Sequence, residues 1–192
     1  MLKHVAGLMA VMVLLATPAL ADAAFDATQR SAMEGDAAAQ ATLAYDYAKG
    51  IGTAVDVPAA ARWYRKSADQ GYLPAYSRLA GIYYLGEGGV ARDVPATLKL
   101  VNAGVARNDA ECLFLLGAFY AEGDIFPPDY ALAASYYQRA VDLGMREAYG
   151  NLADLYRYGR GVPQDVARAR ALTVKGAELG SEASAQWLRD NP

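Results

Sequence analysis

The chain has 192 residues, of which 54% are hydrophobic and 20% are charged, and its formal net charge is −3. This composition is typical of a folded domain that is large enough to bury a core. The mild acidity argues against a nucleic-acid-binding protein, which needs a basic face, and it gives no support for docking to an anionic membrane surface.

The first 21 residues have the parts of a secretory signal peptide. Lys3 precedes an apolar run over residues 5–16, and small residues, Ala19 and Ala21, then occupy the two positions that define a cleavage site. The apolar run is too short to span a bilayer, so a permanent membrane anchor is the less favoured alternative. We therefore predict cleavage after Ala21 and export to the periplasm of a Gram-negative bacterium. Cleavage would also remove His4, the only histidine.

Residues 22–38 are expected to form an N-terminal capping helix. Ala32 and Gly35 stand where the second helix of the first repeat, described next, has Ala68 and Gly71. A single helix at this place would cover the apolar end of a helical stack.

A repeated pattern of leucine, tyrosine, glycine and aspartate fills the chain from residue 39 onward. Its first landmark is a leucine that recurs every 36 or 37 residues. These leucines are Leu43, Leu79, Leu116 and Leu152. A fixed period in this range is the signature of a stacked-repeat architecture. We predict four repeats, at about 39–74, 75–111, 112–147 and 148–183.

Each repeat is predicted to contain two helices joined by a short turn. A tyrosine four residues after the leucine lies on the same face of the first helix, and a glycine ends this helix. An aspartate then begins the second helix by accepting the free amides of its first turn. These aspartates are Asp56, Asp93, Asp129 and Asp165. The second helix ends at Gly71, Asn108, Gly144 or Gly180.

The end of the chain predicts a last helix that covers the fourth repeat. Trp187 and Leu188 fall on the register of a first helix, in a segment that starts at Glu182. We expect the repeats and this C-terminal capping helix to occupy 39–188, and residues 189–192 to form a tail.

The pattern resembles the Sel-one-like repeat family, which is related to the tetratricopeptide repeats. The matching residues are L-A-x-x-Y-x-x-G-x-G from Leu43 to Gly52 and D-x-x-x-A-x-x-W-Y-x-x-x-A-x-x-G from Asp56 to Gly71. The resemblance covers residues from about 26 to 188. It implies an all-α fold, a right-handed α/α superhelix, and a role as an adaptor or regulatory scaffold. Such a scaffold would assemble envelope or polysaccharide machinery, or restrain a membrane sensor.

Cys112 is the only cysteine of the chain. It occupies the small-residue position that Ala75 and Ala148 fill in other repeats, which favours a buried small side chain over a reactive or intermolecular thiol. Some secreted members of the family carry a disulfide in each repeat and have been linked to penicillin-like ligands. A single cysteine excludes an intrachain disulfide, so that assignment does not carry over.

The sequence offers little catalytic chemistry. Without His4 the mature chain has no histidine for a nucleophile pair or a zinc site. The glycines at 86–89 and 159–161 recur at the turn between two helices and are better explained as turns than as phosphate loops. We predict a protein that is not an enzyme and holds no cofactor and no metal. The alternatives are a hydrolase or β-lactam-binding enzyme, and a structural spacer.

Aromatic and charged residues mark a candidate groove for a protein or peptide partner. In related repeats, the residues two and five or six positions after the first-helix leucine point into a concave groove. Those positions, and others upstream on the same face, give the predicted site: Tyr45, Lys49, Ser77, Tyr84, Glu111, Phe114, Glu122, Asp154, Arg157 and Tyr158. Aromatic anchors among charges suit a peptide-binding surface. The alternative is that they are scattered surface or inter-repeat packing residues. The turn over 126–128, Phe-Pro-Pro, is a second candidate contact, and the alternative is that it folds onto its own repeat.

Overall fold

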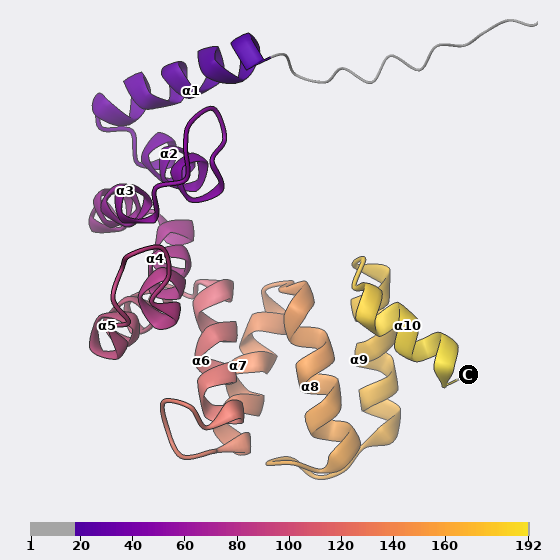
Figure 1. Ribbon diagram of the computed structural model, residues 1–192. Helices are drawn as coiled ribbons and strands as arrows, with labels where there is room; N and C mark the ends of the chain where they lie inside the picture. The colour runs from indigo at the N-terminus through magenta and orange to yellow at the C-terminus, as the bar shows by residue number, and fades with distance from the viewer. Residues whose placement is uncertain (1–17, 192) are drawn as a thin grey trace, which may run out of the picture.

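The computed structural model describes residues 18–191, and within that range the chain forms ten α-helices and no strand. The helices are α1 (Pro18–Met33), α2 (Ala37–Lys49), α3 (Val57–Asp69), α4 (Leu73–Leu85), α5 (Val94–Val105), α6 (Ala110–Glu122), α7 (Tyr130–Asp142), α8 (Arg146–Tyr158), α9 (Val166–Glu178) and α10 (Glu182–Asp190). They follow one another along a curved stack (Figure 1). The predicted all-α solenoid of helix–turn–helix repeats is confirmed.

Most of the predicted signal peptide lies outside the described residues, so export and cleavage remain predictions. Helix α1 runs without a break through Ala21, so the predicted cleavage site lies within this helix. None of the described helices is long and apolar enough to cross a bilayer.

Eight helices form the four pairs that the sequence pattern predicts, and one helix flanks them at each end. The pairs are α2 with α3, α4 with α5, α6 with α7, and α8 with α9. Helix α1 packs against α2, and α10 packs against α9. Each helix therefore contacts mainly the helices next to it in the chain.

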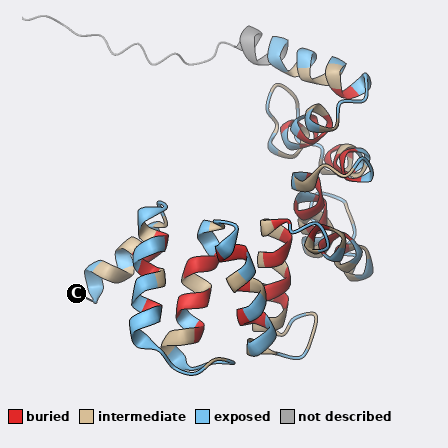
Figure 2. Ribbon diagram, turned by 180° about the vertical axis from the view of Figure 1, so that it is seen from behind, coloured by how far each residue is buried: buried red, intermediate tan, exposed pale blue. Residues whose placement is uncertain are grey.

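Buried residues recur along the stacked helices (Figure 2), and they are mainly leucine, tyrosine and small residues. The first-helix leucines Leu43, Leu79 and Leu152 are fully buried. Beside them, Ala44, Ala80 and Ala153 are also buried and leave room for close helix packing. The core thus uses one large and one small side chain at adjacent positions of each first helix.

The four register aspartates fix the turn inside each repeat through both their side chain and their backbone. Their side chains accept a hydrogen bond from the amide three residues later, at 2.8–2.9 Å, as in Asp56 to Ala59. Their own amides donate to the carbonyl of the register tyrosine, as in Asp56 to Tyr47 at 2.9 Å. The capping explanation of these carboxylates is confirmed.

The Phe-Pro-Pro turn of the third repeat folds back on its own repeat. The Phe126 ring stacks on Tyr120 with ring centroids 4.8 Å apart. Phe126 also packs against the core cluster that contains Leu116. The turn therefore folds onto its own repeat, which is one of the two alternatives that the sequence left open.

Candidate functional site

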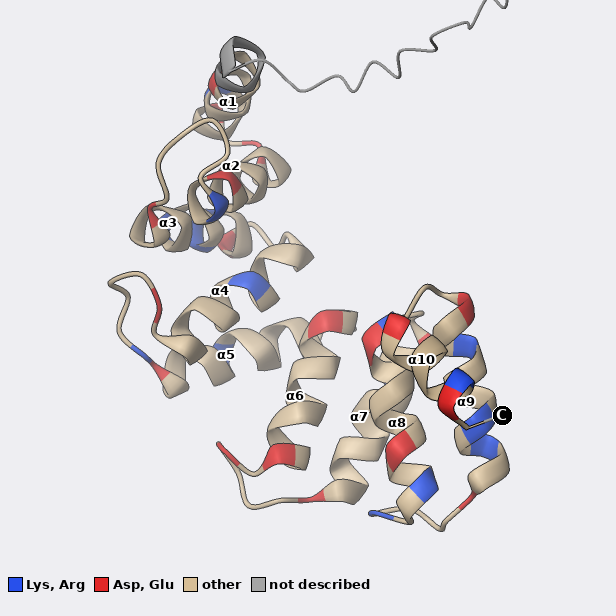
Figure 3. Cartoon of the chain, turned by 45° about the vertical axis from the view of Figure 1, so that its right-hand side comes forward, with Lys and Arg blue, Asp and Glu red and all other residues tan. Residues whose placement is uncertain are grey.

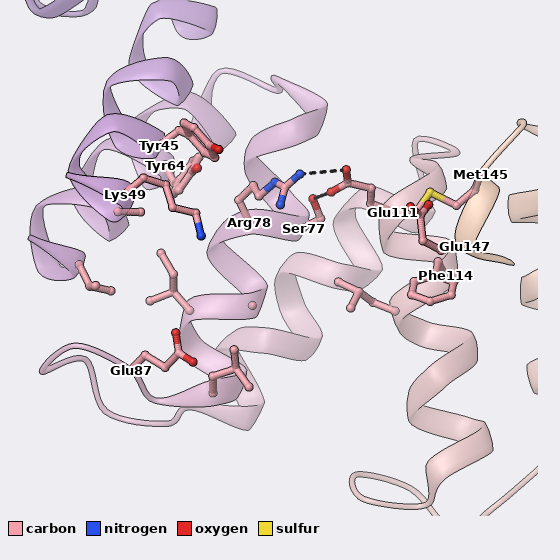
Figure 4. Close-up of a pocket in the computed structure, with 16 residues that line it drawn as sticks. Tyr45, Lys49, Tyr64, Ser77, Arg78, Glu87, Glu111, Phe114, Met145 and Glu147 are labelled. Atoms are coloured by element: carbon pink, nitrogen blue, oxygen red, sulfur yellow. Dashed lines mark hydrogen bonds and ion pairs between the residues drawn. The ribbon is translucent and has the colours of Figure 1, made fainter. Parts of the chain in front are cut away.

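A groove of about 570 Å³ is formed by α2, α3, α4, the turn after α4, α6 and the start of α8. Tyr45 and Tyr64 lie at one end, and Phe114, Met145 and Glu147 at the other (Figure 4). Its polar side chains lie among apolar ones, so it offers both hydrophobic contact area and hydrogen-bonding groups. The apolar lining residues are Ala48, Val57, Gly81, Ile82, Leu85, Phe114, Leu115 and Met145.

Helical spacing explains why the first helices present these residues together. Tyr45 and Lys49 are four residues apart on α2, and Gly81 and Leu85 are four apart on α4, so each pair lies on one face. These positions are two and six residues after the register leucine, which points into the core. A β-carbon at Gly81 would meet nothing within 4 Å, so this glycine leaves open space in the groove.

A polar network crosses the groove between α4 and α6. The Ser77 hydroxyl donates to the Glu111 carboxylate at 2.5 Å, and the Arg78 guanidinium donates to the other oxygen of that carboxylate at 3.4 Å. Ser77 is only 5% exposed, whereas the Arg78 and Glu111 side chains stay half in solvent. An ion pair this exposed adds little stability, but the shared carboxylate fixes the relative positions of two first helices.

Two charged side chains of the groove have no charged partner among the described residues. The Lys49 ammonium extends toward the open space of the groove, and the Glu87 carboxylate lies below it in the turn after α4 (Figure 4). Neither side chain makes a hydrogen bond or an ion pair within residues 18–191. Both charges are therefore available to a ligand.

Two ionisable groups of the groove have shifted pKa values, Glu147 and Tyr64. A hydrogen bond from Arg146 lowers the pKa of the Glu147 carboxyl, which is therefore ionised. Burial raises the pKa of the Tyr64 phenol to about 12, so this group stays neutral. The groove thus presents two phenols, one guanidinium, a bridged carboxylate, one unpaired ammonium and two further carboxylates.

Half of the predicted site residues lie together in this groove. These residues are Tyr45, Lys49, Ser77, Glu111 and Phe114.

The other half of the predicted site residues lies outside the groove. The Tyr84 hydroxyl donates to Asp124 at 2.8 Å, and its ring packs on Phe119 with centroids 5.0 Å apart. That hydrogen bond raises the pKa of Tyr84. Glu122 is exposed at the end of α6 and does not line the groove.

The predicted site residues of α8 lie at the C-terminal end of the stack. Arg157 pairs with Asp154, donates to the Thr173 hydroxyl at 3.2 Å, and lies over the Trp187 ring at 4.0 Å from its centroid. These contacts join α8 to α9 and α10. Tyr158 is exposed beside them.

The groove also includes residues that the sequence pattern did not single out, above all Arg78, Tyr64 and Glu87. The spacing of three residues between Arg78 and Gly81 would have placed both on one face of α4. Glu87 lies in a turn, where no periodicity operates, so no signal in the sequence indicated it.

Cys112 is fully buried and packs beside Gly104, where a β-carbon would lie 2.3 Å from the cysteine sulfur. Burial raises the pKa of its thiol, so the reactive thiolate is scarce.

We expect a disulfide reagent to modify Cys112 in the folded protein at least about 100-fold more slowly than in the urea-unfolded chain. Absorbance of the released thiolate measures both rates, and equal rates would contradict the burial of this residue.

Comparison with known proteins points to one repeat family over most of the chain. The profile of the Sel1 repeat matches residues 37–72, 73–100, 110–145 and 146–181. An uncharacterized protein of Neisseria meningitidis serogroup B is 29% identical over 161 residues, which make up 83% of this chain and 33% of that protein.

Solved structures show the same architecture. A protective antigen of uropathogenic Escherichia coli with an SLR fold is 30% identical, with a TM-score of 0.76 over 85% of this chain and 35% of its own. A Sel1 repeat protein from Oxalobacter formigenes is 28% identical, with a TM-score of 0.76 over 90% of this chain and 49% of its own. An immunity protein of Pseudomonas aeruginosa shares the fold at 18% identity, with a TM-score of 0.62 over 84% of this chain and 59% of its own. The chain thus spans about a third to three fifths of the length of these relatives.

Proposed function

Because the chain belongs to the Sel1 repeat family, a fold that typically mediates protein–protein interaction, we propose that it is a protein-binding adaptor or regulatory scaffold of the periplasm. In this proposal the concave groove holds an extended or helical segment of one partner protein. The observation that carries it is the groove itself, in which aromatic and apolar side chains surround the unpaired charges of Lys49 and Glu87.

The groove is preorganised for such a segment. Its walls are first helices whose inner faces are held by buried leucines such as Leu43 and Leu79. Ser77 and Arg78 on α4 bind the same Glu111 carboxylate of α6, which holds the two helices in register. A ligand therefore binds without an added cost for ordering the walls.

The lining favours binding over catalysis. The Ser77 hydroxyl, the one lining hydroxyl of serine type, is nearly buried and already donates to Glu111. The Tyr64 phenol stays neutral because burial raises its pKa to about 12. Aromatic anchors and unpaired charges, by contrast, are the features that give affinity and selectivity to a peptide groove.

Two observations support a location outside the cytoplasm. The predicted signal peptide over residues 1–21 is the first. The second is the relative described as a protective antigen of uropathogenic Escherichia coli, to which this chain is 30% identical.

The groove proposal predicts that Tyr45→Ala combined with Lys49→Glu lowers the recovery of the partner at least about tenfold. These changes remove an aromatic anchor and reverse the unpaired charge, and both positions are exposed, so the fold should be retained. The measurement is a crosslinking pull-down from periplasmic extract with the chain that starts at residue 22. The captured protein is identified by mass spectrometry, purified, and titrated against each variant by calorimetry.

Tyr158→Ala combined with Arg160→Glu is the matched control, because it makes the same changes at exposed positions outside the groove. It should bind the purified partner as the parent chain does. If the groove variant bound the partner as tightly as the parent chain does, the partner would bind another surface, and the groove proposal would be wrong.

A further inference from the structure

Helix α3 borders a second hollow, of about 460 Å³, on a different face from the groove. Its apolar floor is formed by Pro58 and Ala61 of α3 and by Val90 in the turn after α4, with Tyr83 at one side. The groove uses other α3 residues, Val57 and Tyr64. The two concavities can therefore hold different ligands at the same time.

Three cations line this hollow: Arg62, Arg65 and Lys66. Arg65 and Lys66 follow Arg62 by three and four residues, so each lies on the same side of α3 as Arg62. Figure 3 shows basic residues on α3 in blue. None of them forms an ion pair with a carboxylate within residues 18–191. The cluster thus keeps its positive charge in a chain whose net charge is −3.

Neighbouring aromatic rings orient two of these cations without neutralising them. The Arg65 guanidinium donates to the Tyr83 hydroxyl at 3.1 Å and lies 5.5 Å from the centre of that ring. The Lys66 ammonium lies 3.9 Å from the centre of the Trp63 ring. Arg65 uses one nitrogen in its hydrogen bond to Tyr83, so its other N–H groups can donate to a ligand.

The repeat does not need this cluster in order to fold. The equivalent positions of the second, third and fourth repeats are Lys99, Asn102 and Ala103, then Ser135, Gln138 and Arg139, then Ala171, Val174 and Lys175. Each of those repeats folds with one cation in the set. Three like charges on one helical face repel one another, so folding alone would not favour them.

We propose that this hollow is a docking site for an acidic segment of a partner protein. Carboxylates of the segment meet Arg62, Arg65 and Lys66, and an apolar side chain rests on the floor at Ala61 and Val90. The guanidinium groups can bind carboxylates through two parallel hydrogen bonds. The combination of an apolar floor with a cationic rim fits a peptide that carries both kinds of side chain better than it fits a free inorganic anion, which would leave the floor unused.

The test is fluorescence anisotropy with a fluorescein-labelled octapeptide of alternating glutamate and leucine, compared with its glutamine counterpart. We expect the glutamate peptide to bind at least about tenfold more tightly, and raised salt to weaken it. The double variant Arg62→Glu with Lys66→Glu should lose at least about tenfold in affinity. Both side chains are exposed, so the fold should persist, and circular dichroism checks this.

The matched control reverses two charges at equivalent positions of other repeats, Lys99→Glu with Lys175→Glu, and should bind the glutamate peptide as the parent does. The groove variant Tyr45→Ala should also bind it normally. The proposal is overturned if the glutamine peptide binds equally, or if the matched control loses as much affinity. It is likewise overturned if phosphatidylglycerol vesicles bind through Arg62 and Lys66 while the glutamate peptide does not, since the surface would then be a membrane contact.

Discussion

Replacing Leu79 with alanine is expected to lower the free energy of unfolding by about 3 to 4 kcal/mol. Leu79 is fully buried on α4, between the helices of two neighbouring repeats. Truncation loses the free energy gained when the removed atoms moved from water into the core. It also leaves a cavity that the surrounding helices close only in part. A loss of this size is a large part of the total stability of a typical domain. Urea unfolding, monitored by circular dichroism, measures this change in the free energy of unfolding.

Leu85→Ala is the control for this prediction, because it deletes the same atoms six residues further along the same helix. Leu85 is 58% exposed and lines the groove. Its truncation should change the free energy of unfolding by less than about 0.5 kcal/mol. Similar losses in both variants would contradict the register that places Leu79 in the core and Leu85 in the groove.

Replacing Gly161 with alanine is expected to cost about 3 kcal/mol, for two independent reasons. Gly161 has a φ of +68°, a conformation that costs an ordinary residue about 1–2 kcal/mol. A β-carbon there would also lie 2.2 Å from the backbone carbon of Tyr130, at the start of α7. Relieving that overlap means moving the turn away from the preceding repeat, and overpacking typically costs about 1–3 kcal/mol. The melting temperature should fall by about 6–12 °C.

Gly144→Ala separates the two costs. Gly144 also has a positive φ, +80°, but a β-carbon there would meet nothing within 4 Å. This control should lose only about 1–2 kcal/mol, the cost of the backbone conformation alone. If both variants lost the same amount, the close approach of the fourth repeat to Tyr130 would not exist in solution.

The features that the sequence predicted well are local or periodic. The helix starts at Asp56 and Asp93 depend on amides three residues away, and the buried face of each first helix depends on its leucine. Tyr45 and Lys49 reach the groove because they keep a fixed angular relation to Leu43. Neither result needs knowledge of how repeats curve around one another.

The features that could not be predicted depend on what lies next to a residue in space. Tyr84 precedes the groove residue Leu85 by one position, and this step turns its ring toward Phe119 and Asp124 of the next repeat. Arg157 has the same register position in its repeat as Tyr84, and there α10 places Trp187 against it. A repeat pattern alone does not say which copy is followed by a different helix.

The contact of each helix mainly with its neighbours in the chain has a consequence for how the protein forms. No distant parts of the chain must meet before the first favourable contacts exist, so the entropy of closing long loops stays small. Folding can therefore begin at any helix pair and spread in both directions, and the end pairs should be the first to open in hydrogen exchange. The same independence lets whole helix pairs be added or lost without redesign of the rest.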